Sequence, residues 1–207
     1  MPCPNFIQGL DYQYQADAIG QSNASADNRK PEMIEYRKRS FAAFKKAAEL
    51  DPGDGRAFEY AIAQSLILRE FDDAMSIATS WTQAASHRNE DYEKAKSLRV
   101  AAAIEWERSQ CVSLSTTEKR DCVKKARLSL VEGLQFLKNK VRNADHRKDL
   151  EFAQTYELRG HVRTKSEPPN ATAIAEFMRA RGYYTGLGLF EDVARIDGYI
   201  AELQLET

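Results

Sequence analysis

The stretch from Ser40 to Trp81 constrains the fold more than any other part of the sequence. Small and apolar residues recur there every three or four positions, which is the spacing of one face of an α-helix. The pattern stops at Asp51-Pro52-Gly53-Asp54 and again at Glu70, because proline cannot continue a helix and glycine accepts the turn geometry. The stretch therefore predicts three helical segments joined by two tight turns.

The rest of the chain continues this kind of pattern, and its β-branched residues are scattered without the alternation typical of strands. We therefore expect an all-α protein. Residues 1–10 are expected to be irregular, because Pro2 and Pro4 oppose early helix formation, and Pro31 is expected in the first turn of its helix. The expected helices cover 11–19, 31–50, 56–69, 72–85, 91–109, about 116–138, a segment that opens at 143–145 and ends near 160, 171–184 and 190–203.

Three local signals refine these boundaries. Ser115-Thr116-Thr117-Glu118 has the spacing of a capping box, in which the first and fourth residues satisfy each other's backbone N–H groups. Pro168-Pro169 predicts a break, with Asn170 as the N-cap of the following helix. Gly182 to Gly188 is rich in glycine and is expected to form a turn between helices, since a nucleotide-binding loop would need a preceding strand.

A triad of small, large and again small or bulky residues recurs in the second helix of each expected hairpin. The small residue lets two helix backbones approach, and the large one fills the groove between neighbouring hairpins. Ser40 and Ala74, the first members of the first two triads, are 34 residues apart. The four triads are Ser40, Phe44 and Ala47; Ala74, Ala78 and Trp81; Ala126, Leu130 and Gly133; and Ala173, Phe177 and Ala180.

This pattern resembles the tetratricopeptide repeat (TPR), whose period is about 34 residues. The resemblance is strongest over 31–85, where AAFKKAAELDPGD is similar to the end of one repeat and Phe58, Ala61, Phe71 and Ala74 match positions of the next. Ala61-Ile62 replaces the family's Leu-Gly pair, and later offsets exceed 34 residues, so the match is divergent. The resemblance implies one domain over 1–207, a right-handed superhelix of about four antiparallel hairpins and a C-terminal capping helix.

The resemblance also implies a non-catalytic scaffold or adaptor that binds a peptide or partner protein in a concave groove. Carried over from the family, the groove positions are Arg56, Glu59, Ala63, Leu66 and Ile67. Glu59 and Ala63 stand where chaperone-binding members have the Lys and Asn of a carboxylate clamp. Because these clamp residues are replaced, the sequence argues against an acidic chaperone tail as the ligand.

Charge is uneven along the chain, although the formal net charge of −1 argues against a general polyanion binder. A basic patch is expected at Lys119, Arg120, Lys124, Lys125 and Arg127. It is explained by a solvated helix face, by a surface for an acidic peptide or, less favoured, by nucleic acid, since interleaved aromatic residues are lacking. The alternative function is thus a helical-repeat regulatory or sensor domain that binds a small ligand or nucleic acid through its basic patches.

Residue types that carry catalysis are not brought together by spacing. His87, His146 and His161 are far apart and fall in no metal-ligand pattern, so neither an enzyme nor a cofactor is expected. Cys111 and Cys122 could face each other across a hairpin, and the sequence leaves open whether they form a disulfide or remain thiols, like Cys3.

The chain has no apolar run near the roughly 20 residues of a membrane span and no signal peptide at its start. If that start is native, we expect a cytoplasmic protein. The identity of the protein or peptide partner stays open, as does assembly into a homo-oligomer.

Overall fold

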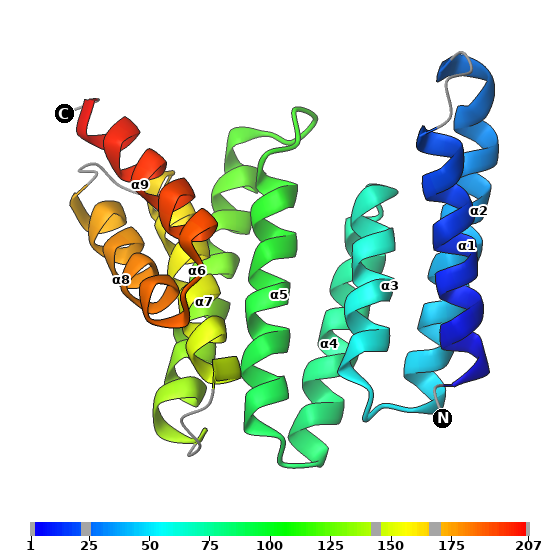
Figure 1. Ribbon diagram of the computed structural model, residues 1–207, viewed down its shortest axis with the longest axis horizontal. Helices are drawn as coiled ribbons and strands as arrows, with labels where there is room; N and C mark the ends of the chain where they lie inside the picture. The colour runs from blue at the N-terminus through cyan, green and yellow to red at the C-terminus, as the bar shows by residue number, and fades with distance from the viewer. Residues whose placement is uncertain (1–2, 22–25, 142–145, 166–170, 206–207) are drawn as a thin grey trace. The chain divides into compact units, whose positions relative to one another are not determined.

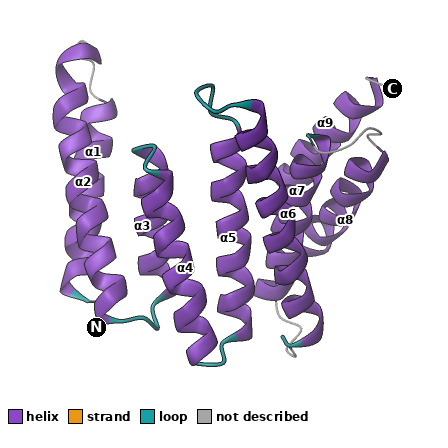
Figure 2. Cartoon of the chain, turned by 180° about the vertical axis from the view of Figure 1, so that it is seen from behind, coloured by secondary structure: helices purple, strands orange, loops and turns teal. Residues whose placement is uncertain are grey.

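The computed structural model describes residues 3–21, 26–141, 146–165 and 171–205. Over these residues the chain forms nine helices and no strand, which confirms the all-α prediction (Figure 2). The chain divides into two compact units, Met1–Arg88 and Asn89–Thr207. We describe each unit by itself, and the arrangement of both as one superhelical domain over 1–207 stays a prediction.

The first unit contains four helices that pair in chain order (Figure 1). Helix α1 packs on α2, α2 on α3 and α3 on α4. The pairs α1–α2 and α3–α4 are the first two helical hairpins. Their bounds are α1 Pro4–Gln21, α2 Ala26–Leu50, α3 Gly55–Ile67 and α4 Phe71–His87.

Two predictions near the N-terminus are wrong. Residues 1–10 are not irregular where they are described, because α1 begins at Pro4. A proline at the first helical position loses nothing, since its missing N–H would have no partner there. Helix α2 begins at Ala26, so Pro31 lies inside the helix and not in its first turn.

The first hairpin is held by a close approach between α1 and α2. The hydroxyl of Ser40 donates a hydrogen bond of 2.9 Å to the carbonyl oxygen of Gly9. A Cβ atom at Gly9 would stand 2.7 Å from the ring of Phe44. Any residue other than glycine at this position would therefore displace the ring. Phe44 also meets Phe6 of α1 and Tyr60 of α3, with ring centroids 5.4 and 4.9 Å away. The first triad therefore joins three helices.

The second hairpin follows the predicted turns. The carboxylate of Asp54 accepts a hydrogen bond from the backbone N–H of Arg56 and caps α3. After α3, Arg69 adopts a left-handed backbone with φ of 62°, which ends the helix without a glycine. Trp81 of α4 is fully buried and its ring is stacked on Phe58 of α3, with centroids 5.8 Å apart.

The second unit contains two further hairpins and a final helix (Figure 1). Helix α5 packs on α6, α6 on α7, α7 on α8 and α8 on α9, and α5 also contacts α7. The bounds are α5 Asp91–Ser109, α6 Thr116–Asn139, α7 His146–Thr164, α8 Ala171–Leu187 and α9 Phe190–Leu205.

The predicted capping box is confirmed, with Ser115 N–H donating to Glu118 at 2.8 Å and Glu118 N–H donating to the Ser115 hydroxyl at 3.3 Å. The prediction of a turn over Gly182 to Gly188 is wrong for most of its length. Helix α8 continues to Leu187, and only Gly188, with φ of 72°, stands in the turn. The predicted signals at 143–145 and 168–170 lie outside the described residues.

All twelve triad residues are buried, and each triad lies on the second helix of a hairpin. The last hairpin repeats the contact of the first. A Cβ atom at Gly160 of α7 would stand 2.6 Å from the ring of Phe177 of α8. The small and large positions of the pattern thus set how closely the helices of a hairpin approach.

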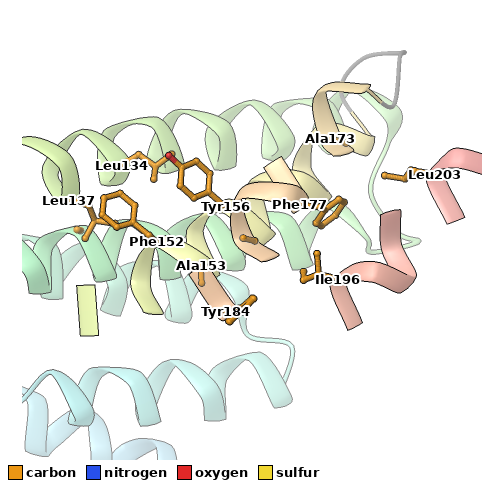
Figure 3. Close-up of a cluster of buried hydrophobic side chains, with 12 residues drawn as sticks. Leu134, Leu137, Phe152, Ala153, Tyr156, Ala173, Phe177, Tyr184, Ile196 and Leu203 are labelled. Atoms are coloured by element: carbon orange, nitrogen blue, oxygen red, sulfur yellow. The ribbon is translucent and has the colours of Figure 1, made fainter. Parts of the chain in front are cut away.

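The main core of the second unit is formed by α6, α7, α8 and α9, together with Ala95 of α5 (Figure 3). Leu134 and Leu137 of α6 belong to the same buried cluster as Phe152 and Tyr156 of α7. Ile196 and Leu203, the two buried residues of α9, close the cluster. Helix α9 therefore packs on α8 through these buried residues, and its role as the capping helix of a superhelix stays a prediction.

Candidate functional site

The five predicted groove residues share one face of α3. Arg56, Ala63 and Ile67 are exposed, whereas Glu59 and Leu66 are half-buried. Arg56 donates two hydrogen bonds of 2.9 Å to Asp54. The structure thus places the five side chains together at a surface of the first unit, and their role in binding stays a prediction.

The predicted basic patch lies on α6, in the turns that follow the capping box. Arg120, Lys124, Lys125 and Arg127 are exposed, and Lys119 is half-buried. Lys125 forms an ion pair of 3.7 Å with Glu105 of α5. The patch is a solvated helix face, and its role in binding also stays a prediction.

A groove of about 420 Å³ lies in the second unit, among four helices. The first helices of both hairpins, α5 and α7, supply most of its walls, and α8 and α9 supply the rest. Most of these side chains are half-buried, so the groove is open to solvent. Its lining residues are Arg99, Ala103, Trp106, Glu107, Leu150, Gln154, Glu157, Leu158, His161, Tyr184, Asp192 and Arg195.

A buried ion pair joins α5 to α7 beside this groove. Arg99 donates hydrogen bonds of 2.6 and 3.3 Å to the two carboxylate oxygens of Glu151, whose side chain is only 1% exposed. A guanidinium matches a carboxylate with two parallel donors, which fixes the orientation of both groups. The ion pair therefore fixes α5 and α7, which form two walls of the groove, relative to each other.

A second polar network joins α7, α8 and α9. The hydroxyl of Tyr184 donates a hydrogen bond of 2.6 Å to Glu157, and Arg195 forms ion pairs with Glu157 and Asp192. Burial, reinforced by Asp192, raises the pKa of Tyr184 to about 12. Tyr184 therefore keeps its proton at neutral pH and acts as a donor.

Aromatic side chains surround His161 at the other end of the groove. The imidazole is stacked with Trp106 at a centroid distance of 6.3 Å, and it meets Phe177 and Tyr199 edge-on at 5.1 and 4.7 Å. His161 also lines a neighbouring cavity of about 290 Å³ between α7, α8 and α9. The groove thus combines an aromatic end with polar walls, in which Arg99 and Arg195 are paired with carboxylates.

The surroundings of His161 favour its neutral form. Burial lowers the pKa of His161 below its ordinary value of 6.5. In the pH range between the lowered and the ordinary value, the unfolded chain binds a proton that the folded chain does not. The stability that comes from neutral His161 is therefore fully present above about pH 6.5, and it is lost as the pH falls from there through the lowered pKa of the folded chain.

We expect the thermal unfolding midpoint of the chain to be lower at pH 5.5 than at pH 7.5. His161→Phe should make this difference smaller. Phenylalanine keeps the aromatic contacts but cannot take up a proton. Scanning calorimetry at several pH values measures the effect. His87→Gln, at the exposed end of α4, is the control and should follow the wild type. An identical pH dependence of wild type and His161→Phe would show that this histidine is not the titrating group.

Titratable side chains of the groove are restrained by their surroundings. Tyr184 is protonated and His161 is enclosed by rings. All three cysteines are free thiols, and burial, reinforced by Glu105, raises the pKa of Cys122 to about 11. Within the described residues no group of three or more His, Cys, Asp or Glu could hold a metal ion.

The sequence does not indicate this groove. His161 lies far from the other histidines in the chain, and nothing in the sequence connects Arg99 to Glu151 across 52 residues. The signal that points to α5 and α7 is the resemblance to the TPR, in which ligands lie along the first helix of each hairpin.

No helix in the described parts of the chain is both long and apolar enough to cross a membrane. No model of a known protein family matches the chain, and no curated protein is significantly similar to it.

Proposed function

We propose that the chain is a TPR-like interaction scaffold and that the groove of the second unit holds a segment of a partner protein. The proposal is carried by one observation: the first helices α5 and α7, with α8 and α9, line an open groove. This agrees with the resemblance, in which ligands lie along the first helices of the hairpins. A groove preformed by packed helices limits the ordering cost of binding.

The lining favours a segment with an apolar or aromatic anchor and polar flanks. Trp106, Leu150 and Leu158 offer apolar surface, and tryptophan is enriched among residues that dominate binding energy. The charges of Arg99 and Arg195 are already paired with carboxylates of the chain. A strongly charged ligand would have to compete with these pairs, so an amphipathic segment fits better.

Random peptides displayed on phage can be selected on the full chain and their affinities measured by fluorescence titration. We expect Ala103→Arg, which places a long side chain in the groove, to weaken the selected peptides about tenfold or more. Ala63→Arg makes the same change on the predicted α3 face. Ala175→Arg, at an exposed position of α8, is the control and should bind as the wild type does.

The outcome separates the two candidate faces. A loss of affinity in Ala63→Arg alone would move the binding site to α3, and no loss in either variant would refute both assignments. Trp106 lines the groove while Trp81, the other of the two tryptophans, is fully buried. A change in emission that disappears in Trp106→Phe would therefore locate the peptide.

A second candidate function is a regulatory or sensor domain that binds a small ligand. The groove volume of about 420 Å³ favours it, because small-molecule sites commonly measure about 300–1,000 Å³. A metabolite that raises the unfolding midpoint and is displaced by Ala103→Arg would support this candidate.

A further inference from the structure

Three arginines converge on one carboxylate between α7 and α8, away from the groove. Arg159 and Arg163 of α7 lie with their Nε atoms 3.6 and 3.3 Å from Oε1 of Glu176, a residue of α8. Arg179, one turn further along α8, donates a hydrogen bond of 3.2 Å to Oε2 of the same carboxylate. We call these four side chains the arginine cluster.

The arginine cluster carries an excess of positive charge. Glu176, whose side chain is 4% exposed, neutralises only one of the three guanidinium groups. Burial lowers the pKa of Arg159; Glu176 opposes this effect, while Arg163 and Arg179 add to it. Like charges held together in a partly buried place raise the free energy of the folded chain. A dianion at the cluster would remove this cost.

The cluster also has more donors than its acceptor can use. Each guanidinium carries five N–H donors and no acceptor. The Nε atoms of Arg159 and Arg163 are buried and have no hydrogen-bond partner among the described residues. Arg179 is 55% exposed and lies over the ring of Tyr156 at 5.7 Å, so the cluster is reached from solvent on its side.

The cluster is separate from the groove. On α7 the groove is lined by residues that include Glu157 and His161, which lie two positions before Arg159 and Arg163. Two positions correspond to a rotation of roughly 200° about the helix axis. The arginines therefore project from the opposite side of α7 and lie beside α8.

We propose that Arg159, Arg163 and Arg179 bind a phosphate group. Guanidinium groups that approach from two helices match the oxygens of a tetrahedral anion, and arginine is the residue best suited to phosphate. In its dianionic form, phosphate balances the two positive charges that Glu176 leaves. This assignment is independent of the proposed peptide groove and of the basic patch on α6.

Equilibrium dialysis of the full chain against inorganic phosphate, at constant ionic strength, tests the proposal. We expect saturable binding at one site, weakened about tenfold or more in Arg163→Gln and in Arg179→Gln. Arg181→Gln is the matched control, because Arg181 lies on α8, like Arg179, but is paired with Asp197. Circular dichroism checks that each variant remains folded.

Glu176→Gln provides a test with the opposite sign. Glu176 competes with phosphate for the guanidinium donors, so its replacement should strengthen phosphate binding about threefold or more. A purely structural ion network predicts no phosphate binding in either form. Absence of saturable binding, or equal weakening in Arg181→Gln, would overturn the proposal.

The bound phosphate group could come from a phosphorylated protein segment or from free phosphate, and a phosphoserine peptide distinguishes these two sources. A phosphoserine peptide that binds more tightly than inorganic phosphate would identify a phosphorylated protein segment as the source. Equal affinities would identify free phosphate. Both results support the site.

Discussion

Trp81→Ala is expected to lower the free energy of unfolding of the first unit by about 3–5 kcal/mol, the usual cost of truncating a large buried aromatic residue. Trp81 is fully buried on α4 and stacked on Phe58 with an interplanar angle of 7°. Alanine would leave a cavity where the indole joins α3 to α4. Because the whole stability of a domain is about 5–15 kcal/mol, this change removes a large fraction of it.

Urea unfolding followed by circular dichroism measures the effect through the midpoint of the transition. Trp106→Ala is the comparison, since it removes the same atoms from a half-buried place on the groove wall. We expect a clearly smaller loss there. Equal losses at the two sites would show that burial of the indole does not determine the cost.

Arg99→Met is expected to cost the second unit about 3–5 kcal/mol, because it leaves the buried carboxylate of Glu151 without its partner. The double variant Arg99→Met with Glu151→Met should recover most of this loss, since the cost comes from an unpaired charge. A double-mutant cycle with urea unfolding gives the coupling energy.

Arg181→Met is a closely matched control. Arg181 binds Asp197 with distances of 2.6 and 3.4 Å, almost those of Arg99 and Glu151, but the side chains are 49% and 48% exposed. An exposed ion pair contributes only about 0–1 kcal/mol. A similar loss in both single variants would contradict the view that burial makes Arg99 important.

The helices were predictable where their signals are local. The Ser115–Glu118 capping box depends on four consecutive residues, and the predicted helix over 91–109 has the observed bounds. The buried triads were predictable because helical period places their members on one face. Local signals failed where one residue type serves two roles, as with Pro4, which starts a helix that it was expected to prevent.

The groove and the unit boundary were not predictable in the same way. Arg99 meets Glu151, and Tyr184 meets Glu157, through packing between helices that no local pattern encodes. The boundary after Arg88 has no Gly-, Ser- or Pro-rich tract to mark it. Arg69 ends α3 in a left-handed conformation that sequence rules assign to glycine or asparagine.

The contacts of Gly9 with Phe44 and of Gly160 with Phe177 indicate how such a chain can change its length. About twice as many residues separate the first pair as separate the second. A Cβ atom added at either glycine would nevertheless stand at nearly the same distance from the aromatic ring. The crossing point of each hairpin is therefore fixed by these side chains, and the number of residues between them is free to vary. Helix α1 continues to Gln21 beyond Gly9, whereas α7 ends at Thr164, close after Gly160. The helices of a hairpin can therefore be longer or shorter beyond the crossing point without changing the contact that joins them.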